Sequence, residues 1–147
     1  MIAVIQRVTS CDVSIDGDIT SSIKTGILVL LGIQNEDNQD DIKYISNKIL
    51  KMRIFNDNQK HMNLSVGDVD GSIMIVSQFT LCGDVKRGNR PSYINAMDVD
   101  LARGVYNSFI DYIGSCYSKV KSGIFQANMK VNLINDGPVT LIIRSKD

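Results

Sequence analysis

The residues of this sequence with the clearest chemical potential are Ser77-Gln78-Phe79-Thr80, which follow the apolar run Ile73-Met74-Ile75-Val76. The run predicts a buried strand, so the polar residues come where the strand ends and where side chains and backbone amides are free to meet a ligand. Serine, glutamine and threonine are neutral hydrogen-bonding groups, and the consecutive amides of Phe79 and Thr80 could stabilise a developing oxyanion. For this segment alone, a strand end whose polar residues cap a turn is the simpler interpretation.

Other common catalytic groups are scarce. His61 is the single histidine and lies in a polar loop, where an ordinary solvated role is expected. A metal site built on several histidines is therefore impossible, and no C-x-x-C, H-E-x-x-H or glycine-rich phosphate loop occurs in the sequence. The sequence predicts neither a metal nor a cofactor.

Two further features could bind nucleic acid. Lys86, Arg87 and Arg90 form a short positive cluster. Such a cluster is usually a solvated loop, but beside a site it could also contact a phosphate backbone. Phe125 is either a core residue or a platform on which a base stacks.

Near the end of the chain, Gly137-Pro138 interrupts two strand-like runs, residues 129–134 and 139–144. Because proline has no amide N–H to donate to a central strand, the pair must form a turn, a bulge or a sheet edge. Taken alone, it is ordinary hairpin punctuation.

The remaining pattern predicts the elements that position these residues. Strands are expected at residues 2–8, at 12–23 with a hairpin turn at Asp16-Gly17, at 26–33 and at 72–79, and two or three strands close the chain. One helix begins near Asn38 and carries Ile42, Ile45, Ile49 and Met52, and a second is marked by Leu101, Val105, Phe109, Ile110, Ile113 and Cys116. This order predicts one compact α+β domain over residues 1–147, with a mostly antiparallel sheet or open barrel and two main helices.

Composition restricts the partners. Sixteen Lys and Arg balance sixteen Asp and Glu, so no general attraction to nucleic acid or membrane is expected, and any RNA contact must use a local patch. Three scattered cysteines without a C-x-x-C pair favour a reducing compartment. The longest apolar run, residues 27–33, is too short to span a bilayer. We therefore expect a cytoplasmic protein.

Taken together, several segments resemble the D-aminoacyl-tRNA deacylases of the bacterial and eukaryotic type. They are Met1-Ile2-Ala3-Val4-Ile5-Gln6-Arg7-Val8, Ser77-Gln78-Phe79-Thr80-Leu81, Lys86-Arg87-Gly88-Asn89-Arg90-Pro91-Ser92, Gly123-Ile124-Phe125 with Met129, and Asn135-Asp136-Gly137-Pro138-Val139-Thr140. These segments occur in the family's order and span the whole chain, whose length is also typical of the family.

The resemblance implies an enzyme that hydrolyses the ester between a D-amino acid and the 3′-terminal adenosine of tRNA, and that also cleaves mischarged glycyl-tRNA. It implies a homodimer with the compact fold of this family, with neither DNA nor membrane as a partner. In this family the Gly-Pro turn, with a cis peptide bond, completes the partner's site. The carbonyl groups of Gly137 and Pro138 would clash with an L side chain and leave room for a D side chain or glycine. Arg7 would brace this turn.

The resemblance also suggests roles for the remaining residues. The catalytic segment is Ser77, Gln78, Phe79 and Thr80, with the amides of Phe79 and Thr80 serving the ester carbonyl. Thr80 could be a nucleophile, but no base in the sequence is obviously placed to activate it. We therefore prefer a supporting role, with the substrate's own 2′-hydroxyl directing water. The residues that would contact adenosine and tRNA are Phe125, Ala127, Met129, Lys86, Arg87 and Arg90.

One residue departs from the family pattern. Gln126 stands where the family usually has glycine, and it adds bulk beside the expected adenine platform. Two other classes of function stay open, a non-catalytic RNA- or nucleotide-binding module and a purely structural dimerisation domain. Neither explains why Ser77-Gln78-Phe79-Thr80 accompanies Gly137-Pro138 in one chain.

Overall fold

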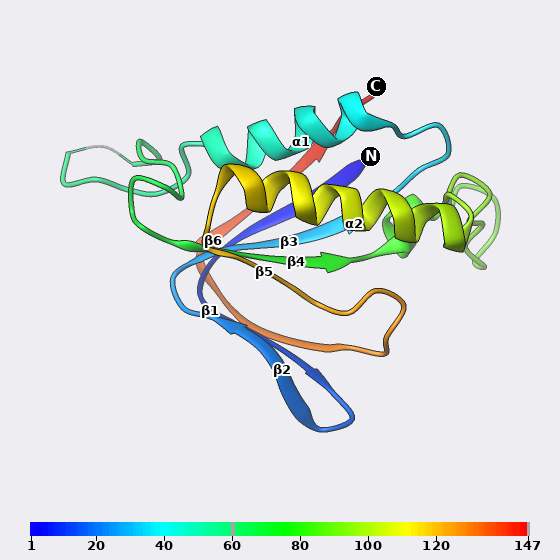
Figure 1. The fold of residues 1–147 in the computed structure, drawn as a ribbon, viewed down its shortest axis with the longest axis horizontal. Helices are drawn as coiled ribbons and strands as arrows, with labels where there is room; N and C mark the ends of the chain where they lie inside the picture. Colours follow the sequence, from blue (N-terminus) through cyan, green and yellow to red (C-terminus); the bar gives the residue numbers. More distant parts are fainter. Residues whose placement is uncertain (60, 147) are drawn as a thin grey trace.

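The computed structural model describes residues 1–59 and 61–146, and it contains both strands and helices (Figure 1). In chain order they are β1 (Ile2–Ile15), β2 (Asp18–Ile23), β3 (Gly26–Gly32), α1 (Gln39–Lys51), β4 (Ser72–Ser77), the 3-10 helix η1 (Phe79–Cys82), α2 (Val99–Cys116), β5 (Val120–Ser122) and β6 (Lys130–Arg144).

The strands form one mixed sheet in the order β2-β1-β3-β4-β5, with β6 paired to β1. The pairings of β1 with β2, β3 and β6 are antiparallel, whereas β3–β4 and β4–β5 are parallel. Parallel neighbours need crossover connections, and α1 and α2 supply them. The sheet curls into a nearly closed barrel, which confirms the predicted α+β open barrel with two main helices.

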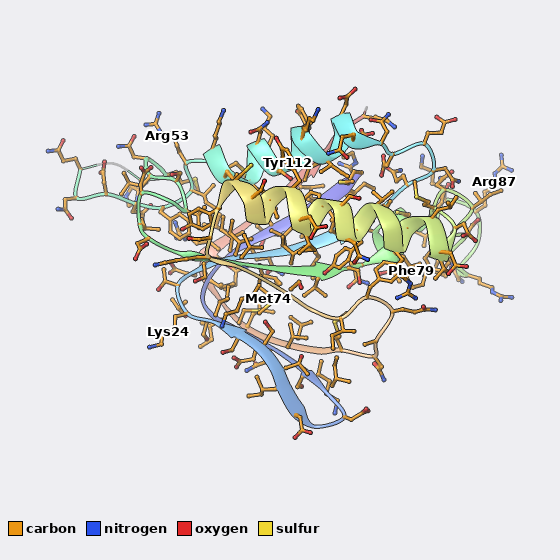
Figure 2. All side chains as sticks on the ribbon, viewed as in Figure 1. Lys24, Arg53, Met74, Phe79, Arg87 and Tyr112 are labelled. Atoms are coloured by element: carbon orange, nitrogen blue, oxygen red, sulfur yellow. The ribbon has the colours of Figure 1, made fainter. Side chains whose placement is uncertain are left out.

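The two helices lie side by side on one face of the sheet, whereas the β1–β2 hairpin and the first half of β6 lie on the other (Figure 1). Each side has its own apolar core. The core beneath the helices includes Ile5, Ile45 and Phe109, and the core on the other side is built around Leu28 and Met74 (Figure 2). β3 is buried on both faces between these cores, as its unbroken apolar sequence predicts.

Local signals placed α1 and the first hairpin correctly. Asn38 caps α1 in a reciprocal capping box with Asp41, and the hairpin turns at Asp16-Gly17, both with positive φ. The second helix, predicted from apolar residues between Leu101 and Cys116, is confirmed as α2, but not all of these residues are buried, since Leu101 is 66% exposed and Cys116 is also exposed. The buried stripe instead consists of Ala102, Tyr106, Phe109 and Ile113.

The two strand-like runs at the end of the chain do not form a hairpin. Both belong to β6, and both pair with β1. Val8 pairs with Asn135 and Gln6 pairs with Thr140, so the four residues 136–139 bulge out opposite Arg7 alone. Gly137-Pro138, whose peptide bond is cis, lies in this bulge. Of the three predicted possibilities, the bulge is therefore correct.

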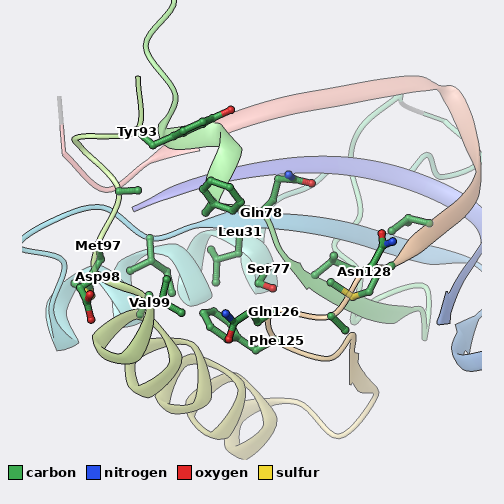
Figure 3. Close-up of a pocket in the computed structure, with 18 residues that line it drawn as sticks. Leu31, Ser77, Gln78, Tyr93, Met97, Asp98, Val99, Phe125, Gln126 and Asn128 are labelled. Atoms are coloured by element: carbon green, nitrogen blue, oxygen red, sulfur yellow. The ribbon is translucent and has the colours of Figure 1, made fainter. Parts of the chain in front are cut away.

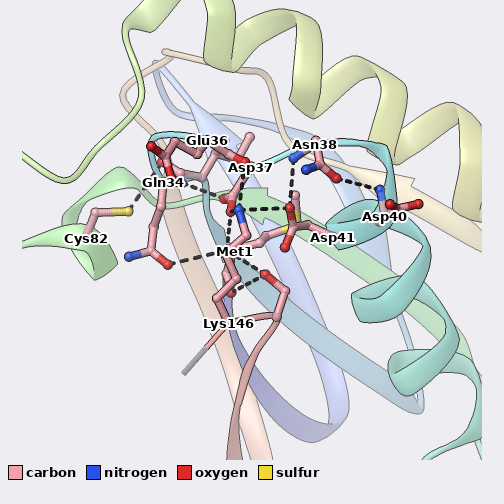
Figure 4. Close-up of polar contacts among 11 residues, drawn as sticks. Met1, Gln34, Glu36, Asp37, Asn38, Asp40, Asp41, Cys82 and Lys146 are labelled. Atoms are coloured by element: carbon pink, nitrogen blue, oxygen red, sulfur yellow. Dashed lines mark hydrogen bonds and ion pairs between the residues drawn. The ribbon is translucent and has the colours of Figure 1, made fainter.

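A buried ionic cluster joins the first residue to the start of α1 (Figure 4). The α-amino group of Met1 lies 2.6 Å from Asp37 Oδ1, and both groups are inaccessible to solvent. Lys146 Nζ lies 3.2 Å from Asp41 Oδ2. Burial alone would raise the pKa of Asp41, but hydrogen bonds from the Ser145 side chain, the Asn38 amide and Lys146 lower it.

Over residues 1–59 and 61–146, neither helix combines the length and the apolar character needed to cross a membrane.

Candidate active site

A cavity of about 610 Å³ opens where β4 ends, between the start of α2 and the segment that leads into β6 (Figure 3). Of the predicted site residues, Ser77, Gln78, Phe79, Phe125, Ala127 and Met129 line it, whereas Thr80, Arg7, the basic cluster and the bulge do not. Its walls consist of Leu31, Ile33, Val76, Ser77, Gln78, Phe79, Tyr93, Ala96, Met97, Asp98, Val99, Ala102, Phe125, Gln126, Ala127, Asn128, Met129 and Val131.

Three residues of the predicted catalytic segment, Ser77, Gln78 and Phe79, form one end of this cavity, and Thr80 follows directly after them. Ser77 is the last residue of β4, and the Gln78 amide donates to Leu31 O at 2.7 Å, which continues the parallel ladder by one step. The chain then turns into η1, so the amides of Phe79 and Thr80 begin a helical turn and have no acceptor within it. Among the described residues these two amides donate to no backbone carbonyl. They are therefore available to a ligand.

The side chains of this segment are also arranged for contact. Gln78 Nε2 donates to Thr80 Oγ1, which orients the threonine hydroxyl. Phe79 is 60% exposed and meets the edge of Tyr93, with ring centroids 5.0 Å apart. Tyr93 was not predicted as a site residue. Its position directly after the basic cluster was the only signal, and it contained no information about Phe79.

The opposite wall is built on Phe125. Its ring centroid lies 5.4 Å from that of Tyr106, and the guanidinium of Arg103 lies over the ring at 4.9 Å. Tyr106 OH donates to Ile75 O at 3.1 Å, and burial raises the pKa of this phenol, so it is a structural donor and not a base. Ala127 and Met129 also line the cavity, so the structure brings all three predicted adenosine-side residues together.

Lys86, Arg87 and Arg90 do not line the cavity. They are exposed on a loop whose ends are joined by the Asp84–Ser92 bridge, and Figure 2 shows Arg87 at the same end of the molecule as Phe79. His61 is exposed and does not line the cavity, in agreement with its expected solvated role.

The bulge of β6 is braced from beneath by Arg7, which is only 6% exposed. Arg7 Nε donates to Asp136 O at 3.1 Å and pairs with Asp136 Oδ2 at 3.1 Å, while Nη1 donates to Ile54 O at 2.6 Å. The buried guanidinium therefore fixes the bulge to Ile54 in the segment that follows α1. The residues around Arg7 in the sequence do not predict that it is buried, because its hydrogen-bond partners, Ile54 and Asp136, are far away along the chain.

Asn135 adds a second brace that was not singled out from the sequence. Its Oδ1 accepts from the Val139 amide at 2.8 Å, and its Nδ2 donates to Gln6 Oε1 at 2.7 Å. One side chain thus closes the bulge across its base. Gly137 and Pro138 are exposed at its tip.

This tip is remote from the cavity of its own chain. From Ser77 the path to the bulge crosses β3 and β1 and runs four residues along them. At about 4.8 Å per strand and about 3.3 Å per residue, this path is roughly 20 Å along the sheet. Gly137-Pro138 and Ser77-Gln78-Phe79-Thr80 therefore do not form one site within a single chain.

The cavity is nearly free of charge. Among the residues that line it there is one carboxylate, Asp98, and no lysine, arginine, histidine or cysteine. Asp98 already accepts the amides of Asp100 and Leu101 as the N-cap of α2. In the described part of the chain, no three His, Cys, Asp or Glu side chains are grouped as metal ligands. Such a site can act by positioning and by amide hydrogen bonds to a developing negative charge.

Comparison with known proteins places the chain in a family. The family model described as D-Tyr-tRNA(Tyr) deacylase matches residues 4–144. The D-aminoacyl-tRNA deacylases of Fervidobacterium nodosum and Flavobacterium psychrophilum are both 51% identical to the chain. The first match covers 99% of this chain and 98% of the relative, and the second covers 100% and 99%.

Two solved structures have the same fold. One, described as a c-Myc DNA unwinding element binding protein, is 44% identical, with a TM-score of 0.94 and coverage of 98% of both chains. The other, described as a probable eukaryotic D-amino acid tRNA deacylase, is 15% identical, with a TM-score of 0.82 and coverage of 97% of both chains. By its sequence matches the chain belongs to the D-Tyr-tRNA(Tyr) deacylase family, and it is an enzyme.

Proposed function

We propose that this protein hydrolyses the ester that joins a D-amino acid to the terminal adenosine of tRNA, in the cytoplasm. The observation that carries the proposal is the nearly uncharged cavity at the end of β4. Phe79 lies at one side, where the amides of Phe79 and Thr80 donate to no backbone carbonyl of the described residues, and Phe125 lies at the other. An aminoacyl ester needs an oxyanion site beside its carbonyl, and its adenosine needs an aromatic surface. The Phe79 amide at one side of the cavity and the Phe125 ring at the other support these two roles, in a chain that belongs to this family.

In the proposed reaction the ester carbonyl oxygen accepts from the amides of Phe79 and Thr80. Water adds to the carbonyl carbon, and these amides stabilise the oxyanion that forms. The bond to the ribose 3′-oxygen then breaks, this oxygen takes a proton, and free amino acid and tRNA leave. Thr80 has a supporting role, because Gln78 donates to its oxygen and no base among the cavity residues is placed to activate it. The substrate's 2′-hydroxyl directs the water.

We assign selectivity to the Gly137-Pro138 bulge of a second copy of the chain. This bulge is exposed, is held by the buried Arg7, and lies roughly 20 Å along the sheet from its own cavity, so a homodimer is the arrangement that uses it. Its fixed backbone carbonyls would meet an L side chain and leave a D side chain free. Glycine has no side chain to reject, so glycyl-tRNA is a substrate as well.

The rest of the substrate follows from this placement. Adenine contacts Phe125, Ala127 and Met129 in the cavity wall, and the exposed Lys86, Arg87 and Arg90 contact phosphates of the acceptor end. A non-catalytic nucleic-acid-binding role, which the name of the c-Myc DNA unwinding element binding protein suggests, is less well supported. The chain has no net charge, and its one basic cluster is too small to neutralise a long duplex.

The first experiment compares hydrolysis of D-Tyr-tRNA and L-Tyr-tRNA by the purified protein. Lys43→Ala is the control, because Lys43 is exposed on α1, away from the cavity. Rapid loss of the D-ester with the L-ester spared supports the proposal. Survival of both esters, with tRNA still bound, would mean that the cavity belongs to a binding protein.

Completion by a second copy has its own test. Phe125→Ala weakens adenine binding in the cavity and Gly137→Ala damages the bulge, so at substrate concentrations well below the wild-type KM each homodimer should be nearly inactive. In a heterodimer purified with two different tags, one intact cavity faces one intact bulge. Recovered activity supports completion between subunits. An isolated heterodimer as inactive as its parents would refute it, because completion within one chain leaves no intact site.

A further inference from the structure

Gln126 has an unusual conformation beside the adenosine wall of the cavity. Its φ is +67°, in the left-handed region that favours glycine, and its side chain lines the cavity next to Phe125. Figure 3 shows it beside the Phe125 ring and not among the residues of the catalytic end.

The contact that directs Gln126 comes from Arg103 on α2. Arg103 Nη2 donates to Gln126 Oε1, and the same guanidinium lies over the Phe125 ring at 4.9 Å. An arginine can only donate, so the amide oxygen must face Arg103, and the NH₂ group must face elsewhere. Among the described residues no protein atom accepts from this NH₂ group.

We propose that Gln126 contacts the substrate base. In this proposal its NH₂ group donates a hydrogen bond to a ring nitrogen of the terminal adenine, and Arg103 is a positioning residue that holds the amide for this contact. The inference rests on the proposed function, which places adenine against Phe125. Adenine offers acceptors at N1, N3 and N7, and a glutamine amide is a well-matched partner for its edge. Stacking on Phe125 accepts any base, so the amide adds selectivity that the ring lacks.

The decisive test pairs base analogues with one substitution. Adenosine is compared with 1-deaza-, 3-deaza- and 7-deazaadenosine, each of which replaces one ring nitrogen by CH. Binding to the wild-type protein and to Gln126→Met is followed by NMR titration up to millimolar concentrations. Methionine keeps the length of the side chain and removes both donors. We expect one analogue to bind the wild type about 3- to 10-fold more weakly than adenosine, and Gln126→Met to lose this difference.

Other results contradict the proposal. If the wild type binds all three analogues as it binds adenosine, no ring nitrogen is recognised. If it binds neither adenosine nor any analogue up to millimolar concentrations, the proposed contact with adenine is not made. If Gln126→Met discriminates as the wild type does, another group makes the contact. Gln39→Met, an equivalent change at an exposed glutamine on α1, should discriminate like the wild type.

The role of Arg103 needs a separate readout. Arg103→Met should lose the same analogue discrimination, and Arg103→Lys should restore part of it, because an ammonium group can still donate to Gln126 Oε1. On D-Tyr-tRNA both methionine variants should raise KM about 3- to 10-fold with little change in kcat, because the contact is remote from the ester. The double variant should be no worse than Gln126→Met alone. Full discrimination in Arg103→Met would overturn the positioning role.

The Gln126 contact and the hydrolysis of the ester can be refuted separately. An active wild type without analogue discrimination removes the Gln126 contact and leaves the proposed reaction intact. A wild type that discriminates between analogues but cleaves no ester removes the reaction and leaves the contact.

Discussion

Replacement of Gly137 by alanine tests how the bulge of β6 is held. The φ of Gly137 is +122°, which an L residue adopts at a cost of about 1–3 kcal/mol. A Cβ added there would also lie 2.8 Å from Arg7 Nη2 and 2.9 Å from Val139 Cγ2, and both distances are shorter than van der Waals contact allows. Arg7 cannot move freely, because Ile54 O and Asp136 O hold it. Weakening one such charged hydrogen bond costs about 1.5–3 kcal/mol.

Together these effects should lower the free energy of unfolding of Gly137→Ala by about 2.5–6 kcal/mol. For a chain of this size the melting temperature should fall by roughly 5–25 °C. Urea denaturation measures the first quantity and calorimetry the second. If the protein is a dimer, both measurements must use one fixed protein concentration.

Gly104→Ala is the matched control. Gly104 lies within α2, and a Cβ there would meet nothing within 4 Å. This variant should be more stable than the wild type by about 0.5–1 kcal/mol, since alanine favours a helix interior. A Gly137→Ala protein that unfolds like the wild type would show that Arg7 and the positive φ do not hold the bulge in one conformation.

Three further predictions concern the cavity, acid stability and thiol reactivity. Phe125→Ala should raise KM for D-Tyr-tRNA about 5- to 100-fold through loss of base stacking, measured by steady-state deacylation, while an unchanged KM would contradict adenine binding there. Because the pKa of Asp41 is lower in the folded state, its stabilisation is present above its unfolded pKa and lost as pH falls through the folded value. Melting temperatures below about pH 4 should therefore fall less steeply in Asp41→Asn than in the wild type, and parallel curves would contradict this. Burial and the nearby Asp12 raise the pKa of Cys11 to about 11. Iodoacetamide added to the native protein at neutral pH should therefore modify the exposed Cys116 and leave Cys11 unmodified, which mass spectrometry of peptides would check. Equal labelling of both cysteines would show that the core around Leu28 and Met74, which contains Cys11, opens readily.

Local signals in the sequence were enough for most elements of the fold. The capping box at Asn38, the Asp16-Gly17 turn and the unbroken apolar run of β3 each depend on neighbouring residues only, so they could be predicted without the fold. The same is true of the segments that resemble the deacylases, because their order and residue types are properties of the chain itself.

Pairing between distant segments could not be predicted in this way. A Gly-Pro pair between two strand-like runs has the same sequence whether the runs pair with each other or both pair with a third strand. Only the long β1, which pairs with β6 from Ile2 to Ser14, makes it a bulge. The exposure of Leu101 was missed for a related reason, since the orientation of α2 depends on the sheet beneath it.

The sequence by itself determined the elements, the absence of ordinary catalytic side chains and the chemical types of the site residues, because each of these is encoded locally. Only the tertiary structure decided which of them meet. It brought Ser77, Gln78, Phe79 and Phe125 to one cavity, placed Arg7 beneath the bulge, and joined Arg103 to Gln126 across 23 residues. It also separated Gly137-Pro138 from the cavity of its own chain. The physical reason is that burial and strand pairing act over the whole sheet, whereas sequence patterns describe a few residues at a time.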